Sequence, residues 1–261
     1  MRFVWGMVMC FFLSTSFGQD TLVQTESIAL APPVISTDSI LFVSSTIVVA
    51  QHPMQEAKVT CSVSGLENDI RLPADQRIFT EKPLNVACSA SHPDFKDSEV
   101  AMLSVRKVNP DISWMVSEES TPPAEKYAAG GFQLLSDRAS PQLDYGIHWL
   151  GFNQPMVELV FDFSAPTYCH QVSLSTLINH RAWIFEPSQI QVFEGEEPLA
   201  TLEIPVAEAS TTAALRFYDL LFEPRLVRSL SIRIQTNSSL PAWHPGKGGQ
   251  GWFFVDEVLF E

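Results

Sequence analysis

MVELVFDF, residues 156–163, and SLSIRIQ, residues 229–235, alternate apolar and polar side chains with a period of two. In the first stretch the apolar residues on one face are Val157, Leu159, Phe161 and Phe163. This period is typical of a half-buried β-strand, because successive side chains of a strand point to opposite sides of the sheet. Both stretches are therefore predicted to be strands that cover a hydrophobic core.

Shorter stretches of the same kind recur along the chain, bounded by Pro, Gly, Asn and Ser. Almost no helical periodicity is present, so the chain is predicted to be all-β. The further strands are expected at residues 40–50, 58–64, 84–91, 98–106, 171–176, 189–194, 199–205, 214–221 and 253–260.

These strands fall into two groups, separated by a connection rich in Pro, Ser and Glu at residues 109–126. Residues 31–108 have the size of a small immunoglobulin-like β-sandwich. Residues 127–261 are predicted to form a second β-sandwich of the jelly-roll type.

The N-terminus, MRFVWGMVMCFFLSTSFG at residues 1–18, has the pattern of a secretory signal peptide. Arg2 precedes an apolar run from Phe3 to Leu13, and small polar residues lead to Gly18. The run is shorter than the roughly 20 residues that span a bilayer, and no other segment is long and apolar enough to do so. The sequence therefore predicts export, a short polar lead at residues 19–30 and no transmembrane segment.

Composition narrows the function classes. The chain has 261 residues, 46% of them hydrophobic, which is enough for packed cores and argues against disorder. Its 30 acidic and 16 basic residues give a formal net charge of -14. Nucleic acid and anionic membranes attract clustered Lys and Arg, so neither is expected as a partner.

Three cysteines remain after removal of the signal peptide. Cys61 in KVTCSVSG and Cys88 in NVACSASH each lie on the apolar face of a predicted strand. In an oxidising compartment they form either a disulfide across neighbouring strands or two separate buried thiols. Cys169 is expected to be a buried thiol, and the absence of a C-x-x-C spacing argues against metal binding by cysteine.

Four motifs in the second group of strands resemble a discoidin-like domain, also called a coagulation-factor type C or galactose-binding-like domain. They are YAAGGFQLLSD (127–137), HWLGF (148–152), AWIFEPSQIQVF (182–193) and LPAWHPGKGGQGWFFVDEVLF (240–260). A similar order of motifs occurs at the C-terminus of bacterial family 20 β-hexosaminidases. The resemblance covers about 135 residues and implies a jelly roll.

The first group of strands is similar to the immunoglobulin-like C-terminal module of chitobiases and β-hexosaminidases. The residues that carry this likeness are APPVIS (31–36), KVTCSVSG (58–65) and PLNVACSASHPDFKDSEVA (83–101). Such modules follow a catalytic barrel, which this chain lacks. The resemblance therefore implies an accessory pair of modules, and an exported glycoside hydrolase or other surface protein as a partner.

Several galactose-binding-like domains hold a structural Ca²⁺ between an early loop acid and a late strand glutamate. Asp137 and Glu257 match these positions, with Asp144 as a helper, and carboxylate oxygens suit Ca²⁺. The early loop reads Asp137–Arg138 where the family has Asp-Gly. The alternative is that Glu257 pairs with Arg138 or accepts hydrogen bonds from loop amides.

Sugars are bound by an aromatic face together with polar groups that contact hydroxyls. In jelly rolls of this type, loops at one end form the site. The expected ligand-binding residues, all in or beside predicted loops, are His180, Arg181, Trp183, Trp243 and His244. The alternative is that Trp149, Trp183 and Trp252 only pack the core or the loops.

No catalytic set has workable spacing, so the protein is not expected to be an enzyme. Asp256 and Glu257 are adjacent in a predicted strand, and their carboxylates should point to opposite faces. The sequence thus predicts an exported, non-catalytic carbohydrate-binding accessory protein for amino-sugar or galactose-type glycans. The alternative is a structural or adhesion protein that binds another exported protein and has no sugar site.

Overall fold

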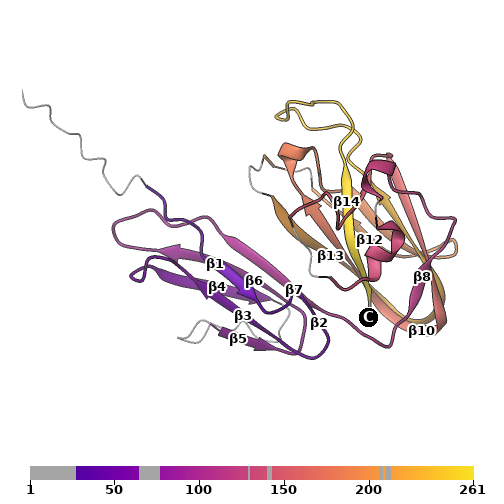
Figure 1. The fold of residues 1–261 in the computed structure, drawn as a ribbon, viewed down its shortest axis with the longest axis horizontal. Coiled ribbons are helices and arrows are strands. Elements are labelled where there is room, and N and C mark those ends of the chain that lie inside the picture. The colour runs from indigo at the N-terminus through magenta and orange to yellow at the C-terminus, as the bar shows by residue number, and fades with distance from the viewer. Residues whose placement is uncertain (1–27, 65–76, 129, 140–142, 206–207, 210–212) are drawn as a thin grey trace, which may run out of the picture.

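The computed structural model describes residues 28–64, 77–128, 130–139, 143–205, 208–209 and 213–261. The predicted signal peptide, residues 1–18, and most of the lead segment lie outside the described residues. The described chain is all-β, as predicted, and forms two β-sandwich modules (Figure 1).

The N-terminal module packs a three-stranded sheet, in the order β1-β3-β5, against a four-stranded sheet, in the order β2-β7-β6-β4. Neighbouring strands are antiparallel except β2 and β7, which are parallel. The strands are β1 (Val34–Thr37), β2 (Leu41–Phe42), β3 (Thr46–Gln51), β4 (Lys58–Ser64), β5 (Arg77–Thr80), β6 (Leu84–Ser91) and β7 (Ala101–Lys107).

The core of this module lies between its two sheets, where alternate residues such as Val48, Ile78 and Val86 are buried. Cys61 of β4 is paired with Cys88 of β6 in the register, and the two form a disulfide with a Cα–Cα distance of 4.1 Å. The disulfide prediction is therefore confirmed. Cys169, in the second module, is a buried free thiol, and burial raises its pKa to about 11.

The C-terminal module is a single hydrogen-bonded sheet in the order β12-β11-β13-β10-β14-β9, to which β8 adds through β10. The described part of its loops includes the short 3₁₀ helices η2 (Glu125–Tyr127), η3 (Gly131–Ser136) and η4 (His180–Ala182). The strands are β8 (Trp114–Val116), β9 (Leu150–Phe152), β10 (Met156–Ile178), β11 (Gln189–Glu194), β12 (Glu197–Glu203), β13 (Ala214–Gln235) and β14 (Phe253–Phe260).

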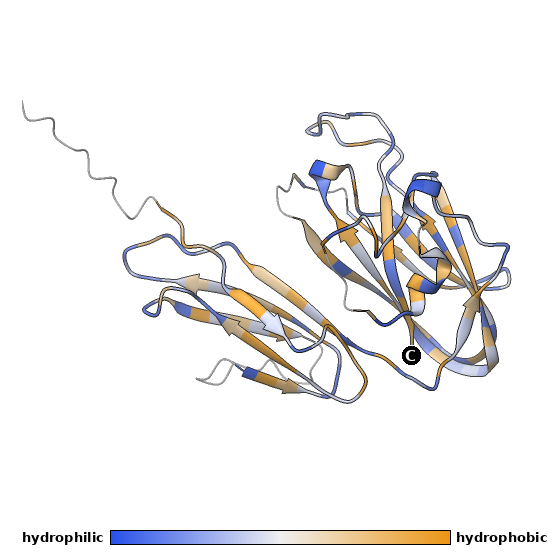
Figure 2. Ribbon diagram, viewed as in Figure 1, coloured by the Kyte–Doolittle hydropathy of each residue, from blue (hydrophilic) through white to orange (hydrophobic). Residues whose placement is uncertain are grey.

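Two long strands, β10 and β13, allow this one sheet to enclose a core. Their pairing shifts register between Asp162 and Thr167 and again between Cys169 and Gln171, so the ribbon bends there. The two strands are antiparallel, so the first half of β10 pairs with the second half of β13. Strand β8 adds to the first half of β10, β11 pairs with the second half of β13, and the second half of β10 also pairs with β14. The apolar colouring in Figure 2 concentrates in these strands, and the loops between them are more hydrophilic.

Part of the predicted connection belongs to the second sheet. Met115 of β8 pairs with Asp162 of β10, so residues 114–116 are hydrogen-bonded into the C-terminal module. Trp114 packs edge-on against Phe161 and Phe260 at ring-centroid distances of 5.0 and 5.6 Å.

The two modules meet where β2 and β7 approach β13 and β14 (Figure 1). Leu41 and Val108 form a small apolar cluster with Leu259. Beside it, the buried Arg106 donates from Nε and Nη2 to the Asp219 carboxylate at 3.2 and 2.7 Å. None of the described helices is long and apolar enough to cross a membrane.

Candidate functional site

The loops at one end of the C-terminal module gather the predicted sugar-binding residues. Trp183 follows η4 and has a left-handed backbone, φ 66°, and its N–H donates to the His180 carbonyl. Its ring stands 5.1 Å from His244, and Trp243 stands 5.7 Å from the same imidazole. The sequence prediction that these loops meet is therefore consistent with the geometry.

The glycine-rich loop of residues 246–249 makes room for the Trp183 ring. A Cβ atom on Gly246 would lie 2.3 Å from the Trp183 ring, so any side chain there would displace the indole. Gly248 has φ 77°, a conformation that glycine adopts without strain. The loop therefore supports the Trp183 ring.

His180 lies beneath the aromatic rings and is buried. Its Nε2 is 3.0 Å from Glu186, whose other carboxylate oxygen is 3.5 Å from Arg216. The imidazole also stacks on Phe185 at 4.5 Å and lies 5.1 Å from Trp243. His180 therefore supports the Trp243 ring and is not exposed for contact with a sugar.

His244 is also buried, and both of its ring nitrogens are used. Nδ1 accepts from the Gly246 N–H at 3.1 Å, and Nε2 lies 2.9 Å from the His180 carbonyl. A carbonyl only accepts, so this arrangement fixes the neutral tautomer with its proton on Nε2. His244 joins the two loops that carry the tryptophans.

Two of the predicted tryptophans are open to solvent and two are not. Trp183 is 41% exposed and Trp243 39%, whereas Trp149 is buried and Trp252 packs against Tyr127. Arg181 is exposed and lines, with Tyr145 and Asn179, an open depression of about 450 Å³. Two indole rings and the Arg181 guanidinium are therefore exposed at this end of the module.

Asp256 and Glu257 do not diverge, and the sequence prediction that they do is wrong. Val258 of β14 pairs with Leu174, and Val255 pairs with Thr176. Two residues of β14 therefore oppose the single residue of β10 between these pairs, which is a β-bulge.

The bulge changes which face each residue of β14 occupies. Phe253, Val255, Val258 and Phe260 all belong to the main core, so the alternation is interrupted between Val255 and Val258. Both acids then lie on the face away from that core, together with Leu259. The sequence FFVDEVLF does not reveal the bulge. Apolar residues stand on both sides of the two acids, so a shift in which residues face the core leaves the pattern unchanged.

The two acids are buried without hydrogen-bond partners. Asp256 is 1% exposed and Glu257 0%, and none of their four carboxylate oxygens has a partner with hydrogen-bond geometry among the described residues. Burial raises the pKa of Asp256 to about 8, and the nearby Asp137 charge adds to this. Burial likewise raises the pKa of Glu257 to about 9, with further contributions from Asp137 and Asp256.

Of the predicted calcium ligands, Asp137 and Glu257 lie near enough for Asp137 to raise the pKa of Glu257. Asp137 accepts from the Ala139 N–H at 2.7 Å, and Asp144 accepts from the Gly146 N–H at 3.0 Å. Within the described ranges, no group of three or more His, Cys, Asp or Glu side chains is arranged to hold a metal ion.

No protein-family model matches the chain, and no curated protein matches it. Solved structures of similar shape include the family 32 carbohydrate-binding module of Streptococcus pneumoniae EndoD, with TM-score 0.40 and 9% identity over 57% of this chain and 95% of that one. The two family 32 modules of Clostridium perfringens ZmpB give 0.33 and 8% over 83% and 81%.

The N-terminal domain of the single-strand break repair protein XRCC1 gives a TM-score of 0.36 and 13% identity, over 59% of this chain and 99% of that domain. These neighbours include both carbohydrate-binding modules and a DNA-repair domain. The similarities are too weak to carry an argument about function, which has to come from the residues themselves.

Proposed function

We propose that this protein is an exported carbohydrate-binding accessory protein, without catalytic activity, and that it binds through Trp183 and Trp243. The observation that carries the proposal is the pair of half-exposed indole rings held on either side of the buried His244. An aromatic face packs against the C–H patch of a sugar ring, and a rigid support lowers the entropic cost of binding.

Arg181 supplies the polar contact in this proposal. It is exposed beside Trp183 and lines the adjacent depression, so its guanidinium can donate to hydroxyl or acetamido oxygens. Amino-sugar and galactose-type glycans remain the proposed ligands. A separate exported glycoside hydrolase or surface protein remains the proposed protein partner.

The test is a glycan array probed with the mature protein, residues 19–261, followed by titration calorimetry on the best glycan. Replacing Trp243 or Trp183 with Ala should weaken binding about tenfold, because each loses a stacking surface. The matched control is Tyr168→Ala, which removes an exposed aromatic ring from β10. An empty array with folded protein, or equal losses in the control, would contradict the proposal.

A protein partner is the second candidate, and one patch favours it. Tyr168 and Leu226 are paired in the register of β10 and β13, and both are exposed, as is the nearby Leu221. Adjacent exposed apolar residues are typical of protein interfaces. If Tyr168→Ala abolished capture of an exported protein while sugars failed to bind, this candidate would replace the first.

A structural Ca²⁺ at Asp137 and Glu257, with Asp144 as a helper, also belongs to the proposal, and loop carbonyls would have to complete its ligands because no three described acids converge. The buried, unpartnered carboxylate oxygens of Asp256 and Glu257 fit a cation, because burying such a group without a partner is costly. A bound Ca²⁺ would neutralise their charge and tie the loop after η3 to β14.

A further inference from the structure

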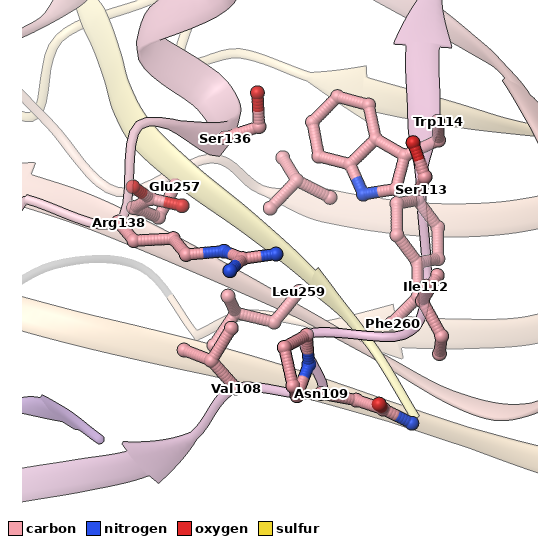
Figure 3. Close-up of a pocket in the computed structure, with 12 residues that line it drawn as sticks. Val108, Asn109, Ile112, Ser113, Trp114, Ser136, Arg138, Glu257, Leu259 and Phe260 are labelled. Carbon is pink, nitrogen blue, oxygen red and sulfur yellow. The ribbon is translucent and has the colours of Figure 1, made fainter. Parts of the chain in front are cut away.

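A cavity of about 270 Å³ lies at the junction of the two modules (Figure 3). Three segments that are far apart in the sequence form it: residues 108–114, residues 136–138 and the end of β14, residues 257–260. Strand β14 begins after the loop that carries Trp243 and runs away from it toward the junction (Figure 1). The cavity is therefore separate from the proposed Trp183–Trp243 face.

Three polar groups in this cavity make no hydrogen bond or ion pair with the described residues. They are the guanidinium of Arg138, the indole N–H of Trp114 and the carboxyl of Glu257. Glu257 does lie close to the Asp137 side chain and the Arg138 backbone N–H, both of which affect its pKa, but neither meets it with hydrogen-bond geometry. Figure 3 shows the Arg138 side chain extending across the cavity between Glu257 and Trp114. A buried carboxyl without a partner is unusual in a folded protein.

The backbone of Arg138 supports a functional role for its side chain. Its φ is 57°, in the left-handed region that favours glycine and that costs other residues about 1–2 kcal/mol. A strained residue persists when the surroundings hold it there, and such residues cluster at ligand sites. Here the strain directs a guanidinium toward a cavity in a protein of net charge -14.

The residues that line the cavity indicate which class of ligand it can bind. Arg138 and Trp114 only donate hydrogen bonds, the Glu257 carboxyl can accept one, and Ile112 and Leu259 provide apolar surface. A hydroxyl group both donates and accepts, so a ring with several hydroxyls satisfies all of these groups at once. The volume is slightly below the range of about 300–1,000 Å³ typical of drug-sized ligands, and it suits a single sugar residue.

We propose that this cavity is a second carbohydrate site, which binds one neutral sugar residue. Arg138 and Trp114 donate to its hydroxyls, the Glu257 carboxyl accepts from another, and the C–H face of the sugar packs against Leu259. The sugar and the proposed Ca²⁺ both use the Glu257 carboxyl, so this site belongs to the metal-free protein.

The experiment is a titration of ¹⁵N-labelled protein, residues 19–261, followed by NMR at the indole N–H signal of Trp114. Galactose, N-acetylgalactosamine and N-acetylglucosamine are the probes, and EDTA keeps Glu257 free of metal. At least one probe should shift the Trp114 signal saturably. Arg138→Gly should weaken that binding about tenfold, the usual effect of losing a charged hydrogen bond.

Arg138→Gly is chosen because glycine adopts φ 57° without strain, so the variant keeps the fold while it loses the guanidinium. Arg138→Lys should restore part of the affinity. The matched control is Arg181→Ala, an exposed arginine at the other end of the module, which should leave the Trp114 titration unchanged.

Three results would overturn the second site: no shift of the Trp114 signal with any of the three sugars, an unchanged titration in Arg138→Gly, or a shift with glucuronate alone. The Trp183→Ala, Trp243→Ala double variant separates this inference from the proposed function. It should abolish glycan binding at the loop end and leave the Trp114 titration intact, so either site can fail without the other.

Discussion

At the scale of single residues, the site is a set of supports beneath two exposed rings. His180 and His244 were predicted as ligand contacts, and the structure places both beneath the indoles, where their nitrogens face Glu186 and backbone groups. Sequence identifies such residues as candidates because His is common in binding sites. It does not show which side of a loop each one faces, since that depends on the packing around it.

Gly246→Ala is predicted to disturb the proposed sugar face without changing any sugar contact directly. The new methyl group would overlap the Trp183 ring, so the indole has to move. We expect sugar affinity to fall about fivefold, the size of a lost aromatic contact. Calorimetry and tryptophan fluorescence measure this, with Lys247→Ala in the same loop as the control. Equal affinity in both variants would show that Trp183 does not bind the sugar.

The buried acids of β14 predict an unusual dependence of stability on pH. The pKa values of Asp256 and Glu257 in the folded protein, about 8 and about 9, lie above the ordinary values of 3.8 and 4.5. Metal-free folded protein therefore holds protons that the unfolded chain releases. This contribution to stability is complete below about pH 4, and it is lost as the pH rises through the folded pKa values.

Denaturant unfolding of metal-free protein between pH 5 and about 9 should show a falling free energy of unfolding. Each acid contributes at most about 1.4 kcal/mol per pH unit. The Asp256→Asn, Glu257→Gln double variant should flatten this slope. Added Ca²⁺ should raise the stability at pH 8 if the proposed metal site is correct, and no effect of Ca²⁺ would remove it from the proposal. A flat profile without metal would show that the acids are hydrated.

At the scale of the elements, the sequence predicted the limits of several short strands correctly. It did not predict that some neighbouring strands join into single long strands. Residues 58–64, 84–91, 189–194 and 253–260 are strands with the predicted limits. In contrast, several predicted strands join to form β10 and β13, which contain Pro166 and Pro224. Proline normally ends a strand, but both prolines lie within the register shifts, where no ladder hydrogen bond is required.

The disulfide between β4 and β6 should stabilise the N-terminal module specifically. It joins residues 27 positions apart, and a loop of this length corresponds to about 3–4 kcal/mol in the chain-entropy account. The Cys61→Ser, Cys88→Ser double variant should lower the unfolding free energy of this module by about that amount. Cys169→Ser, which removes a buried free thiol from the other module, is the control. Unfolding at unchanged denaturant concentration would contradict the prediction.

At the scale of the whole molecule, the ion pair between Arg106 and Asp219 joins the two modules. Arg106 is 3% exposed, and its Nη1 donates to the Asn85 Oδ1 and to the Val105 carbonyl. The guanidinium also lies over the Phe217 ring, 4.9 Å from its centroid. Asp219 also accepts from the Ser173 hydroxyl at 2.6 Å. Because the guanidinium is buried, removal of its carboxylate partner leaves an uncompensated charge between the modules.

Asp219→Ala is therefore predicted to loosen the junction. Small-angle X-ray scattering should show a larger radius of gyration, because water has to reach Arg106 and the modules separate. The control is Glu197→Ala, which removes a carboxylate from the solvent-exposed pair with Arg225 and should change nothing. The same scattering curve for both variants would show that the apolar contacts of Leu41, Val108 and Leu259 are enough to fix the arrangement.

The sequence left open whether Cys61 and Cys88 form a disulfide, and the register of β4 and β6 decided that they do. By itself the sequence determined the all-β class, the two sandwiches and the loops that carry the two tryptophans. These features depend on local alternation and on turn residues, which neighbouring positions in the chain specify. Only the tertiary structure decided that His180 and His244 are buried, that Asp256 and Glu257 share one face, and that Arg138 points into a cavity at the module junction. Each of these depends on pairing and packing between segments far apart in the chain, which the local sequence pattern does not predict.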